Sequence, residues 1–398
     1  MDKIDELLTR GVENIYPSKK ELETLLRSGK KIRLYLGIDP SGARLHVGHM
    51  AVLRKLRQFQ DLGHKVILLV ADFTGMIGDP TGKAGERKML THKQVMENAK
   101  TYKEQAGRVI RFSGENSVEI KNNSTWLSSL TFKEIIELAG NFTVQQMIER
   151  DMFQKRLSDQ KPIGLHEFLY PLMQGYDSVA MDVDLEVGGA DQTFNMLCGR
   201  TLLKNLKNKN KFVLAVPLIA DKNGVKIGKT EGNVIALTAN PEEFFALVMT
   251  LPDEVLINCF ESLTDLPTTE IIKIAQHLKQ GQNPIEVKKY LAFTLTRMLN
   301  SEKDAQKAQK EFEKVVQGGE LPSEIQGIRL SAKEEIAWAD FLVKYNLAKS
   351  KSDAKRLIEQ GGVEIGGERV GDPKEILIPE NNAVIKVGKK NFVKLIVE

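Results

Sequence analysis

The sequence predicts an α/β protein in which a parallel-sheet domain is followed by an α-helical domain and a small α+β domain. Three observations predict this order. A strand-like run at 32–38 is followed by a Gly/Pro/Ser loop, a helical pattern and a second apolar run at 66–71. Residues 240–316 carry helical patterns throughout. From Ser331 onward, two short helical patterns precede alternating strands at 363–370 and 383–397.

Length and composition narrow the class of protein. A chain of 398 residues has room for two or three domains, and 57 Lys plus Arg against 53 Asp plus Glu leave a net charge of +4. This balance excludes a strongly basic, histone-like protein, and the 28% of charged residues excludes a membrane protein. The longest apolar run, 66–71, is far shorter than the ~20 residues of a bilayer span. Two distant cysteines exclude a disulfide framework or a four-cysteine zinc site, so we expect a cytoplasmic protein without membrane contact.

The first sheet unit places a loop at a ligand-binding edge. Ser18 and Glu21 have the spacing of a capping box and predict a helix that extends to Ser28. Beyond the strand at 32–38, apolar residues at helical spacing predict a helix from His49 to Gly63, followed by the strand at 66–71. Strand, helix and strand in this order form a right-handed parallel unit. The loop after the first strand therefore lies at the carboxyl edge of the sheet, where doubly wound folds bind ligands.

The remaining chain separates into recognisable segments. We expect a helical insertion at about 86–160 within a first domain at 1–225, with later strands at 181–187 and 212–220. Asn240-Pro241 and Asn283-Pro284 each pair a cap residue with a proline at the first helical position, and predict a helical domain at 226–317. The segment 318–330 is interpreted as a linker, and 331–398 as the last domain.

The first motif is His46-Val-Gly-His49, in the loop before the predicted helix. Two imidazoles beside the N-terminal amides of a helix suit a phosphate, and Gly48 allows a flat nucleotide to approach the backbone. A zinc pair and a simple helix cap are the alternatives. The other four histidines are scattered singly and no His-Glu-x-x-His occurs, so no metal site is expected.

The second motif, Lys226-Ile-Gly-Lys229-Thr230, follows the strand at 212–220. Alone it is typical of a solvated basic turn. Together with His46-Val-Gly-His49 it resembles the pair of signatures of the class I aminoacyl-tRNA synthetases, His-Ile-Gly-His and Lys-Met-Ser-Lys-Ser. Val47, Ile227, Gly228 and Thr230 depart from those signatures, whereas both lysines are kept.

A third pattern concerns the amino acid that is activated. Tyr170, Gln174 and Asp177 are spaced i, i+4 and i+7 and share one helix face, although Pro171 fits only near a helix start or at a kink. The alternative is an ordinary amphipathic helix, in which an apolar stripe faces the core and these three polar residues face solvent. With Tyr35 and the segments 75–83 and 189–192, the block resembles the tyrosyl-tRNA synthetase family over Tyr35 to Thr230.

The resemblance implies a Rossmann-like catalytic domain and assigns roles to individual residues. Tyr35 and Asp177 would hold the phenol of tyrosine, and Asp79, Tyr170 and Gln174 its ammonium group. Asp39, Gly48, Asp191 and Gln192 would contact the adenylate. The ATP phosphates would meet His46, His49, Lys226, Lys229 and Thr230, with Lys83 and Arg87 at the pyrophosphate end.

The tail has a pattern of its own. Ser350 and Asp353 repeat the capping-box spacing, and Lys351, Lys355 and Arg356 lie beside an apolar helix face. The segment resembles a small RNA-binding domain first recognised in a small-subunit ribosomal protein, and those three cations would contact RNA phosphates. A charged face on an oligomerisation tail is the alternative.

The resemblance thus implies a tyrosine–tRNA ligase. Tyrosine and ATP, with Mg²⁺, would give tyrosyl-adenylate and pyrophosphate, and the tyrosyl group would then pass to the 3′ end of tRNA(Tyr). A homodimer is expected. The alternatives are a tryptophanyl-tRNA synthetase, a small-molecule adenylyltransferase, and a non-catalytic RNA-binding paralogue.

Overall fold

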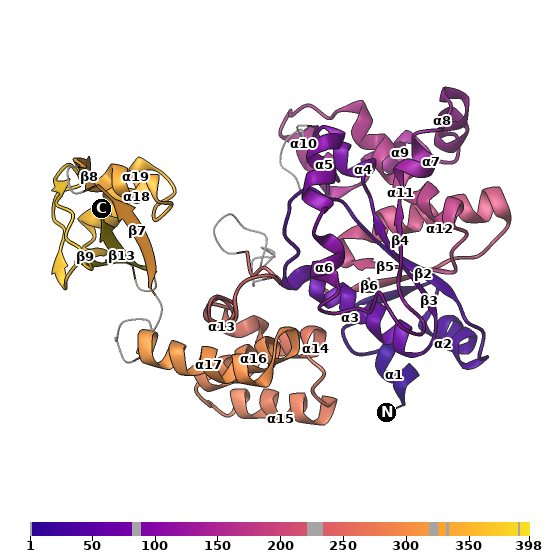
Figure 1. Ribbon diagram of the computed structural model, residues 1–398. Coiled ribbons are helices and arrows are strands. Elements are labelled where there is room, and N and C mark those ends of the chain that lie inside the picture. The colour runs from indigo at the N-terminus through magenta and orange to yellow at the C-terminus, as the bar shows by residue number, and fades with distance from the viewer. Residues whose placement is uncertain (1, 82–88, 221–233, 318–324, 332–333, 389–390) are drawn as a thin grey trace. The chain divides into compact units, whose positions relative to one another are not determined.

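The structure is a computed structural model that describes residues 2–81, 89–220, 234–317, 325–331, 334–388 and 391–398 (Figure 1). The chain divides into two compact units, Met1–Ser301 and Glu302–Glu398, each with its own sheet. In the described ranges, no helix combines the length and the apolar character that crossing a bilayer requires. The mixed α/β fold that the sequence predicts is confirmed.

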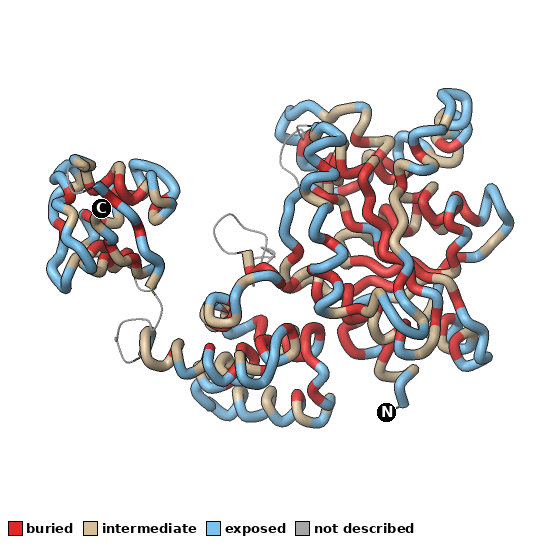
Figure 2. Tube along the Cα trace, in the orientation of Figure 1, coloured by how far each residue is buried: buried red, intermediate tan, exposed pale blue. Residues whose placement is uncertain are grey.

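A six-stranded sheet with the order β1-β6-β5-β2-β3-β4 forms the centre of the first unit. Neighbouring strands from β6 to β4 are parallel, and the edge strand β1 runs antiparallel to β6. The burial colouring of Figure 2 shows the strands of this sheet mostly in red, as expected for a parallel sheet covered on both faces. The strands are β1 (Asn14–Tyr16), β2 (Arg33–Ile38), β3 (Lys65–Val70), β4 (Glu119–Asn122), β5 (Leu185–Gly189) and β6 (Phe212–Val216).

Two crossovers that run in opposite directions create a ligand-binding crevice. β2 is followed by α3 (Val47–Asp61) and then by β3 on one side, whereas β5 is followed by α12 (Thr193–Lys207) and then by β6 on the other. Because parallel crossovers are right-handed, α3 and α12 cover opposite faces of the sheet. The winding direction therefore reverses between β2 and β5, and the space outside the carboxyl ends of these two strands is where such sheets bind ligands.

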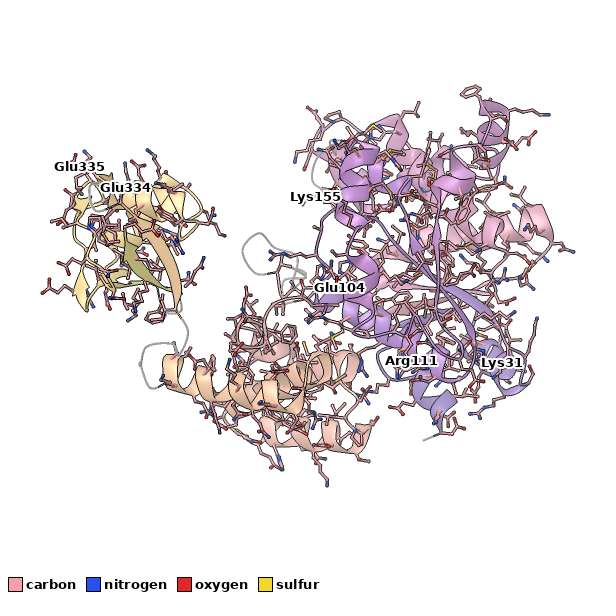
Figure 3. The ribbon with its side chains drawn as sticks, viewed as in Figure 1. Lys31, Glu104, Arg111, Lys155, Glu334 and Glu335 are labelled. Carbon is pink, nitrogen blue, oxygen red and sulfur yellow. The ribbon has the colours of Figure 1, made fainter. Side chains whose placement is uncertain are left out.

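Cations hold the C-terminal end of α3. Lys31 donates from Nζ to the carbonyl oxygen of Leu62 at 2.7 Å, and Arg111 donates to Oδ1 of Asp61 at 2.7 Å. Lys31 and Arg111 are both labelled in Figure 3. Positive charge at the last turn complements the helix dipole. Gly63, with φ of +78°, ends the helix as the sequence predicts.

The segment between β3 and β5 is mainly helical, but it also contributes a strand. β4 pairs in parallel with β3, so part of the insertion expected at about 86–160 extends the central sheet. The four residues of β4 include a single large apolar side chain, Ile120, which is why no strand pattern is visible in the sequence. The helices of this segment are α4 (Thr74–Ile77), α5 (His92–Ala99), α6 (Tyr102–Ala106), α7 (Ser124–Leu127), α8 (Phe132–Ala139), α9 (Val144–Ile148), α10 (Asp151–Ser158) and α11 (Leu165–Met181).

Helices follow β6, as predicted, and pack on the sheet domain. Buried Arg54 of α3 donates to the carbonyl oxygens of Ser262 and Leu263, and Arg10 donates to that of Phe260, at the end of α14. The guanidinium group of Arg54 satisfies carbonyls that a helix end leaves without partners. The helical segment therefore joins the first compact unit. Its elements are α13 (Pro241–Val248), η2 (Asp253–Val255), α14 (Leu256–Leu263), α15 (Thr268–Lys279) and α16 (Pro284–Leu299), and the N-terminal helices are α1 (Lys3–Leu7) and α2 (Lys19–Arg27).

The second unit has a separate core. Its main sheet has the order β10-β9-β12-β13-β7, and Trp338, Phe341 and Leu395 are among its buried residues. β7 lies in the segment 318–330 that was expected to be a linker, because Ile328 and Leu330 alternate with exposed residues and pair with β13. The elements are α17 (Glu302–Phe312), η3 (Glu313–Gln317), β7 (Gln326–Leu330), β8 (Ile336–Ala337), α18 (Trp338–Lys344), α19 (Lys351–Glu359), β9 (Val363–Ile365), β10 (Glu368–Arg369), β11 (Ile376–Leu377), β12 (Val384–Val387) and β13 (Asn391–Val397).

Four strand predictions have the wrong boundaries. The run at 383–397 contains two antiparallel strands, β12 and β13. The run at 181–187 begins inside α11, because Met181 ends that helix and Asp182 adopts a left-handed conformation that turns the chain into β5. The run at 363–370 is the hairpin β9–β10, whose turn contains Gly366 and Gly367 with positive φ. The run at 212–220 stops at Val216, before Pro217.

Candidate active site

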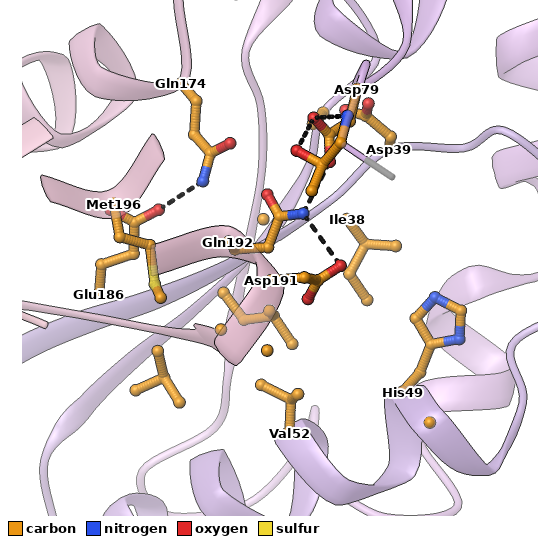
Figure 4. Close-up of a pocket in the computed structure, with 18 of the residues that line it drawn as sticks. Ile38, Asp39, His49, Val52, Asp79, Gln174, Glu186, Asp191, Gln192 and Met196 are labelled. Carbon is orange, nitrogen blue, oxygen red and sulfur yellow. Dashed lines mark hydrogen bonds between the residues drawn. The ribbon is translucent and has the colours of Figure 1, made fainter. Parts of the chain in front are cut away.

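A cavity of about 230 Å³ lies at the carboxyl ends of β2 and β5. Its walls come from the residues after β2, the start of α3, one face of α11 and the turn η1 (Ala190–Gln192) that follows β5. Figure 4 shows side chains from these elements facing one another, with His49 on α3 on one side and Gln174 and Glu186 on the other. The cavity occupies the crevice at which the crossovers reverse direction.

The structure brings most of the residues selected from the sequence into this cavity. The lining includes Tyr35, Asp39, His46, Gly48, His49, Asp79, Tyr170, Gln174, Asp177, Asp191 and Gln192. Lys83, Arg87, Lys226, Lys229 and Thr230 lie outside the described residues. Segments far apart in the chain therefore meet, because the ends of parallel strands share one edge of the sheet.

One end of the cavity is a buried acid–phenol pair. Asp177, 2% exposed, accepts hydrogen bonds from Nε1 of Trp126 at 2.7 Å and from Nδ2 of Asn123 at 3.3 Å. The hydroxyl of Tyr35 lies 3.0 Å from Oγ of Ser178. Burial raises the pKa of Asp177 and that of Tyr35 well above their usual values. This end can hold a polar group of a ligand.

The middle of the cavity carries a second set of acceptors. The hydroxyl of Tyr170 donates to Oδ2 of Asp39 at 2.8 Å, so its lone pairs are available to a cation. Burial raises the pKa of Tyr170 well above its usual value, which keeps the phenol neutral. Oδ1 of Asp39 accepts from the hydroxyl of Thr74 at 2.8 Å.

Asp79 is held from two sides. Its Oδ2 accepts from Nε2 of Gln192 at 2.7 Å, and its Oδ1 accepts from the hydroxyl of Thr81 at 2.6 Å (Figure 4). Thr81 in turn accepts from Nη2 of Arg150 at 2.7 Å. The carboxylates of Asp39, Asp79 and Asp191 thus line one region of the cavity, which suits a cation such as an ammonium group.

The two histidines cap α3. Nδ1 of His46 accepts from the backbone N–H of Gly48 at 3.1 Å, and Nδ1 of His49 accepts from the backbone N–H of His46 at 3.2 Å. The rings lie 4.0 Å apart. The Nδ1 atoms of both histidines therefore act as helix caps, as in the capping alternative. Capping is compatible with phosphate binding, because it fixes both rings at the N-terminal end of the helix, beside the cavity. A Cβ at Gly48 would lie 3.0 Å from the ring of His46, so glycine leaves room for the cap.

Sequence reasoning missed the residues that support the site. Asn123 and Trp126 hold Asp177, and Thr74 holds Asp39, but no spacing links these pairs along the chain. Glu186 offered a signal, because a charged residue stands among the apolar residues of the strand after α11.

A second cavity, beside the first, is lined by Arg150, Lys155 and Phe194 among others.

In the part of the chain that the structure describes, no group of three or more His, Cys, Asp or Glu side chains has the arrangement of a metal site.

The three cations selected in the tail, Lys351, Lys355 and Arg356, are all exposed on α19. Lys351 forms an ion pair with Asp340, and Arg356 with Asp353. The cap that opens α19 forms as predicted, since Oγ of Ser350 accepts from the N–H of Asp353.

Comparison with known families agrees with this geometry. Residues 27–317 match the family model of the class I tRNA synthetases of the tryptophan and tyrosine type, and residues 339–380 match the S4 domain. The chain belongs to this synthetase family. The matched range includes every residue that lines the cavity, so the cavity lies in the synthetase part of the chain.

Relatives of this synthetase are similar over nearly their whole length. The chain is 43% identical to the tyrosine–tRNA ligase of Thermotoga maritima over 98% of this chain and 96% of that protein. It is 41% identical to the tyrosine–tRNA ligase of Aquifex aeolicus, over 95% of each chain.

Solved structures share the fold. The tyrosyl-tRNA synthetase of Archaeoglobus fulgidus, solved with L-tyrosine, superimposes with a TM-score of 0.60 at 22% identity and covers 77% of this chain and all of that one. The truncated mitochondrial tyrosyl-tRNA synthetase of Aspergillus nidulans gives 0.66 at 21% identity, over 78% of this chain and 93% of that one. The fold of the class I synthetases is therefore that of this chain.

Proposed function

We propose that the chain is a tyrosine–tRNA ligase. The observation that carries the proposal is the cavity at the ends of β2 and β5, which has a buried acceptor at one end and a cluster of carboxylates in the middle. Asp177 accepts the phenolic hydrogen of tyrosine, and Tyr35 lies beside it. Asp79, Tyr170 and Gln174 bind the ammonium group. A site with a buried carboxylate for the hydroxyl rejects phenylalanine, because that carboxylate would lose its partner, and tyrosyl-tRNA synthetases are the standard example of this discrimination.

The reaction has two steps. A carboxylate oxygen of tyrosine attacks the α-phosphorus of ATP, the bond to the bridging oxygen breaks, and pyrophosphate leaves. The terminal ribose hydroxyl of the tRNA then attacks the tyrosyl carbonyl, and AMP leaves. Because phosphoryl transfer depends mainly on positioning and on neutralising charge, the amides of α3 and the imidazoles of His46 and His49 are placed to bind the phosphates.

The adenylate lies against Asp39, Gly48, Asp191 and Gln192 in this proposal. Lys83, Arg87, Lys226, Lys229 and Thr230 are assigned to the phosphates from the resemblance of their motifs alone. Mg²⁺ enters as the counter-ion of ATP and belongs to the substrate.

The S4 domain is assigned to tRNA binding, through Lys351, Lys355 and Arg356 on α19. We place domain boundaries at 225 and 317, as the sequence suggests, and we begin the last domain at β7, at Gln326 rather than at residue 331, because β7 pairs with β13. The free thiols of Cys198 and Cys259, both buried, support a reducing compartment such as the cytoplasm. Exposed apolar side chains on α8, α9 and α11 support a homodimer, among them Leu165 at 78% exposure.

ATP–pyrophosphate exchange tests the activity. The chain is incubated with each amino acid in turn, and tyrosine alone is expected to support exchange. Equal exchange with tryptophan would favour the tryptophanyl alternative, and no exchange with any amino acid would favour the non-catalytic paralogue. Exchange that requires a different carboxylic acid would favour the adenylyltransferase alternative.

A further inference from the structure

Three polar side chains lie buried at the inner end of the cavity. Glu186 on β5 is 2% exposed, and both Ser178 on α11 and Lys211, directly before β6, are 0% exposed. Lys211 forms an ion pair with Oε2 of Glu186 and donates to Oγ of Ser178 at 2.7 Å. A buried pair of charges costs desolvation energy, so its presence at a binding cavity calls for a reason beyond stability.

The backbone makes room for the Lys211 ammonium. A Cβ at Gly199, inside α12, would lie 2.5 Å from Nζ of Lys211 and 2.7 Å from Oγ of Ser178. A glycine in a helix interior is unfavourable by roughly 1 kcal/mol relative to alanine. The glycine thus makes room for the lysine but lowers the helix propensity of α12 at this position.

Glu186 lies at the wall of the cavity and holds the side chain of Gln174 there. Its Oε1 accepts a hydrogen bond from Nε2 of Gln174 at 3.0 Å, drawn as a dashed line in Figure 4. A carboxylate has acceptors and no donor, so the favourable partner of Glu186 is the NH₂ of the Gln174 amide. The amide oxygen of Gln174 then faces the cavity, on the side where a cation needs an acceptor.

We propose that Glu186 is a positioning residue that fixes the orientation of the Gln174 amide for binding of the substrate ammonium group, with Lys211 as its buried counter-charge. The inference rests on the proposed activation of tyrosine. It extends the site by two charged residues whose effect on the substrate passes through Gln174.

Glu186→Gln gives a sharp test, because the new amide has one oxygen and one NH₂. The Lys211 ammonium takes the oxygen, since a charge-assisted hydrogen bond is the stronger one. The NH₂ of residue 186 then faces Gln174, which must turn its own oxygen inward and present NH₂ to the substrate ammonium.

The expected result is a rise of about tenfold or more in the KM for tyrosine, equivalent to losing one hydrogen bond to a charged group, with the KM for ATP unchanged. Inhibition by 3-(4-hydroxyphenyl)propionate, which lacks the ammonium group, should not change. Adding Lys211→Met frees the amide of residue 186 to turn back, so the double variant should recover much of the tyrosine affinity.

A matched control separates positioning from packing. Glu186→Leu with Lys211→Met also removes both charges but offers Gln174 no acceptor, so its KM for tyrosine should stay high. This pair of double variants tests the proposal even where Glu186→Gln alone fails to fold, which thermal unfolding will reveal.

Two results would overturn the inference. One is an unchanged KM for tyrosine in folded Glu186→Gln. The other is an equal loss of affinity for tyrosine and for the analogue without ammonium. By contrast, a parent chain that shows no exchange with tyrosine would contradict the proposed function itself.

Discussion

The indole Nε1 of Trp126 donates a 2.7 Å hydrogen bond to Oδ1 of Asp177, which is almost completely buried. Trp126 belongs to α7, which follows directly on β4, whereas Asp177 belongs to α11. The helical insertion expected at about 86–160 thus supplies the residue that orients the acid at the inner end of the cavity. Hydrogen bonds from Trp126 and Asn123 lower the pKa of Asp177, but burial outweighs them and the pKa stays well above its usual value.

Asp177→Asn should make the protein more stable at neutral pH and abolish its preference for tyrosine. Because the folded pKa of Asp177 is raised, the folded state binds the proton more tightly than the unfolded state. The contribution of Asp177 to stability is therefore most favourable below the unfolded pKa near 3.8, and it falls as the pH rises through the folded pKa. A tenfold difference in proton affinity between the folded and unfolded states corresponds to about 1.4 kcal/mol once the pH exceeds both pKa values.

Urea unfolding at several pH values checks this. The stability advantage of Asp177→Asn should grow from about pH 4 to neutral pH. Trp126→Phe is the opposing variant, because loss of the indole donor raises the pKa of Asp177 further and lowers stability at neutral pH. An advantage of Asp177→Asn that does not depend on pH would contradict the titration argument.

His46 should show separable effects on stability and on catalysis. His46→Ala removes the cap on the N–H of Gly48 and should destabilise the protein by about 1 kcal/mol, whereas His46→Asn keeps a good cap acceptor. Both variants should slow adenylate formation by at least about tenfold, with the KM for tyrosine unchanged, because the imidazole is placed for charge on the leaving pyrophosphate. Thermal unfolding and pre-steady-state pyrophosphate release measure the two effects. Full activity in His46→Asn would assign the histidine to capping alone.

Replacing Lys351, Lys355 and Arg356 by alanine should weaken tRNA binding without affecting ATP–pyrophosphate exchange in the presence of tyrosine. Each phosphate contact that is lost should lower the slope of log K against log salt by about 0.7 to 0.9. Lys351 and Arg356 form ion pairs with Asp340 and Asp353, so Lys355→Ala should have the largest single effect. Lys374→Ala, another exposed lysine of the same unit, is the control. Salt titrations of tRNA binding that give the same slope for the triple variant would argue against this face of α19.

Leu165→Asp and Phe132→Asp should each weaken the proposed homodimer. These side chains are 78% and 77% exposed, and a charge placed in an apolar interface carries a desolvation penalty. We expect the dimer Kd to rise about tenfold or more in sedimentation experiments. Ile378→Asp, at a position 75% exposed in the second unit, is the matched control and should leave the dimer intact.

The sequence by itself determined the class of fold and most of the polar residues that line the cavity. Strand, helix and strand around the loop that ends at His46 predict a parallel unit, and the periodicity of Tyr170, Gln174 and Asp177 places them on one helix face. These features are local, because a period of two or of 3.6 residues and a capping residue act within one or two turns. The tertiary structure decided which residues support the site. Trp126 contacts Asp177, and Lys211 contacts Glu186. The two residues of each pair lie on different elements, and no regular spacing in the sequence links them. Their contacts therefore depend on strand order and on burial. Burial also decides the pKa of Asp177, since the same carboxylate in solvent would have its ordinary value.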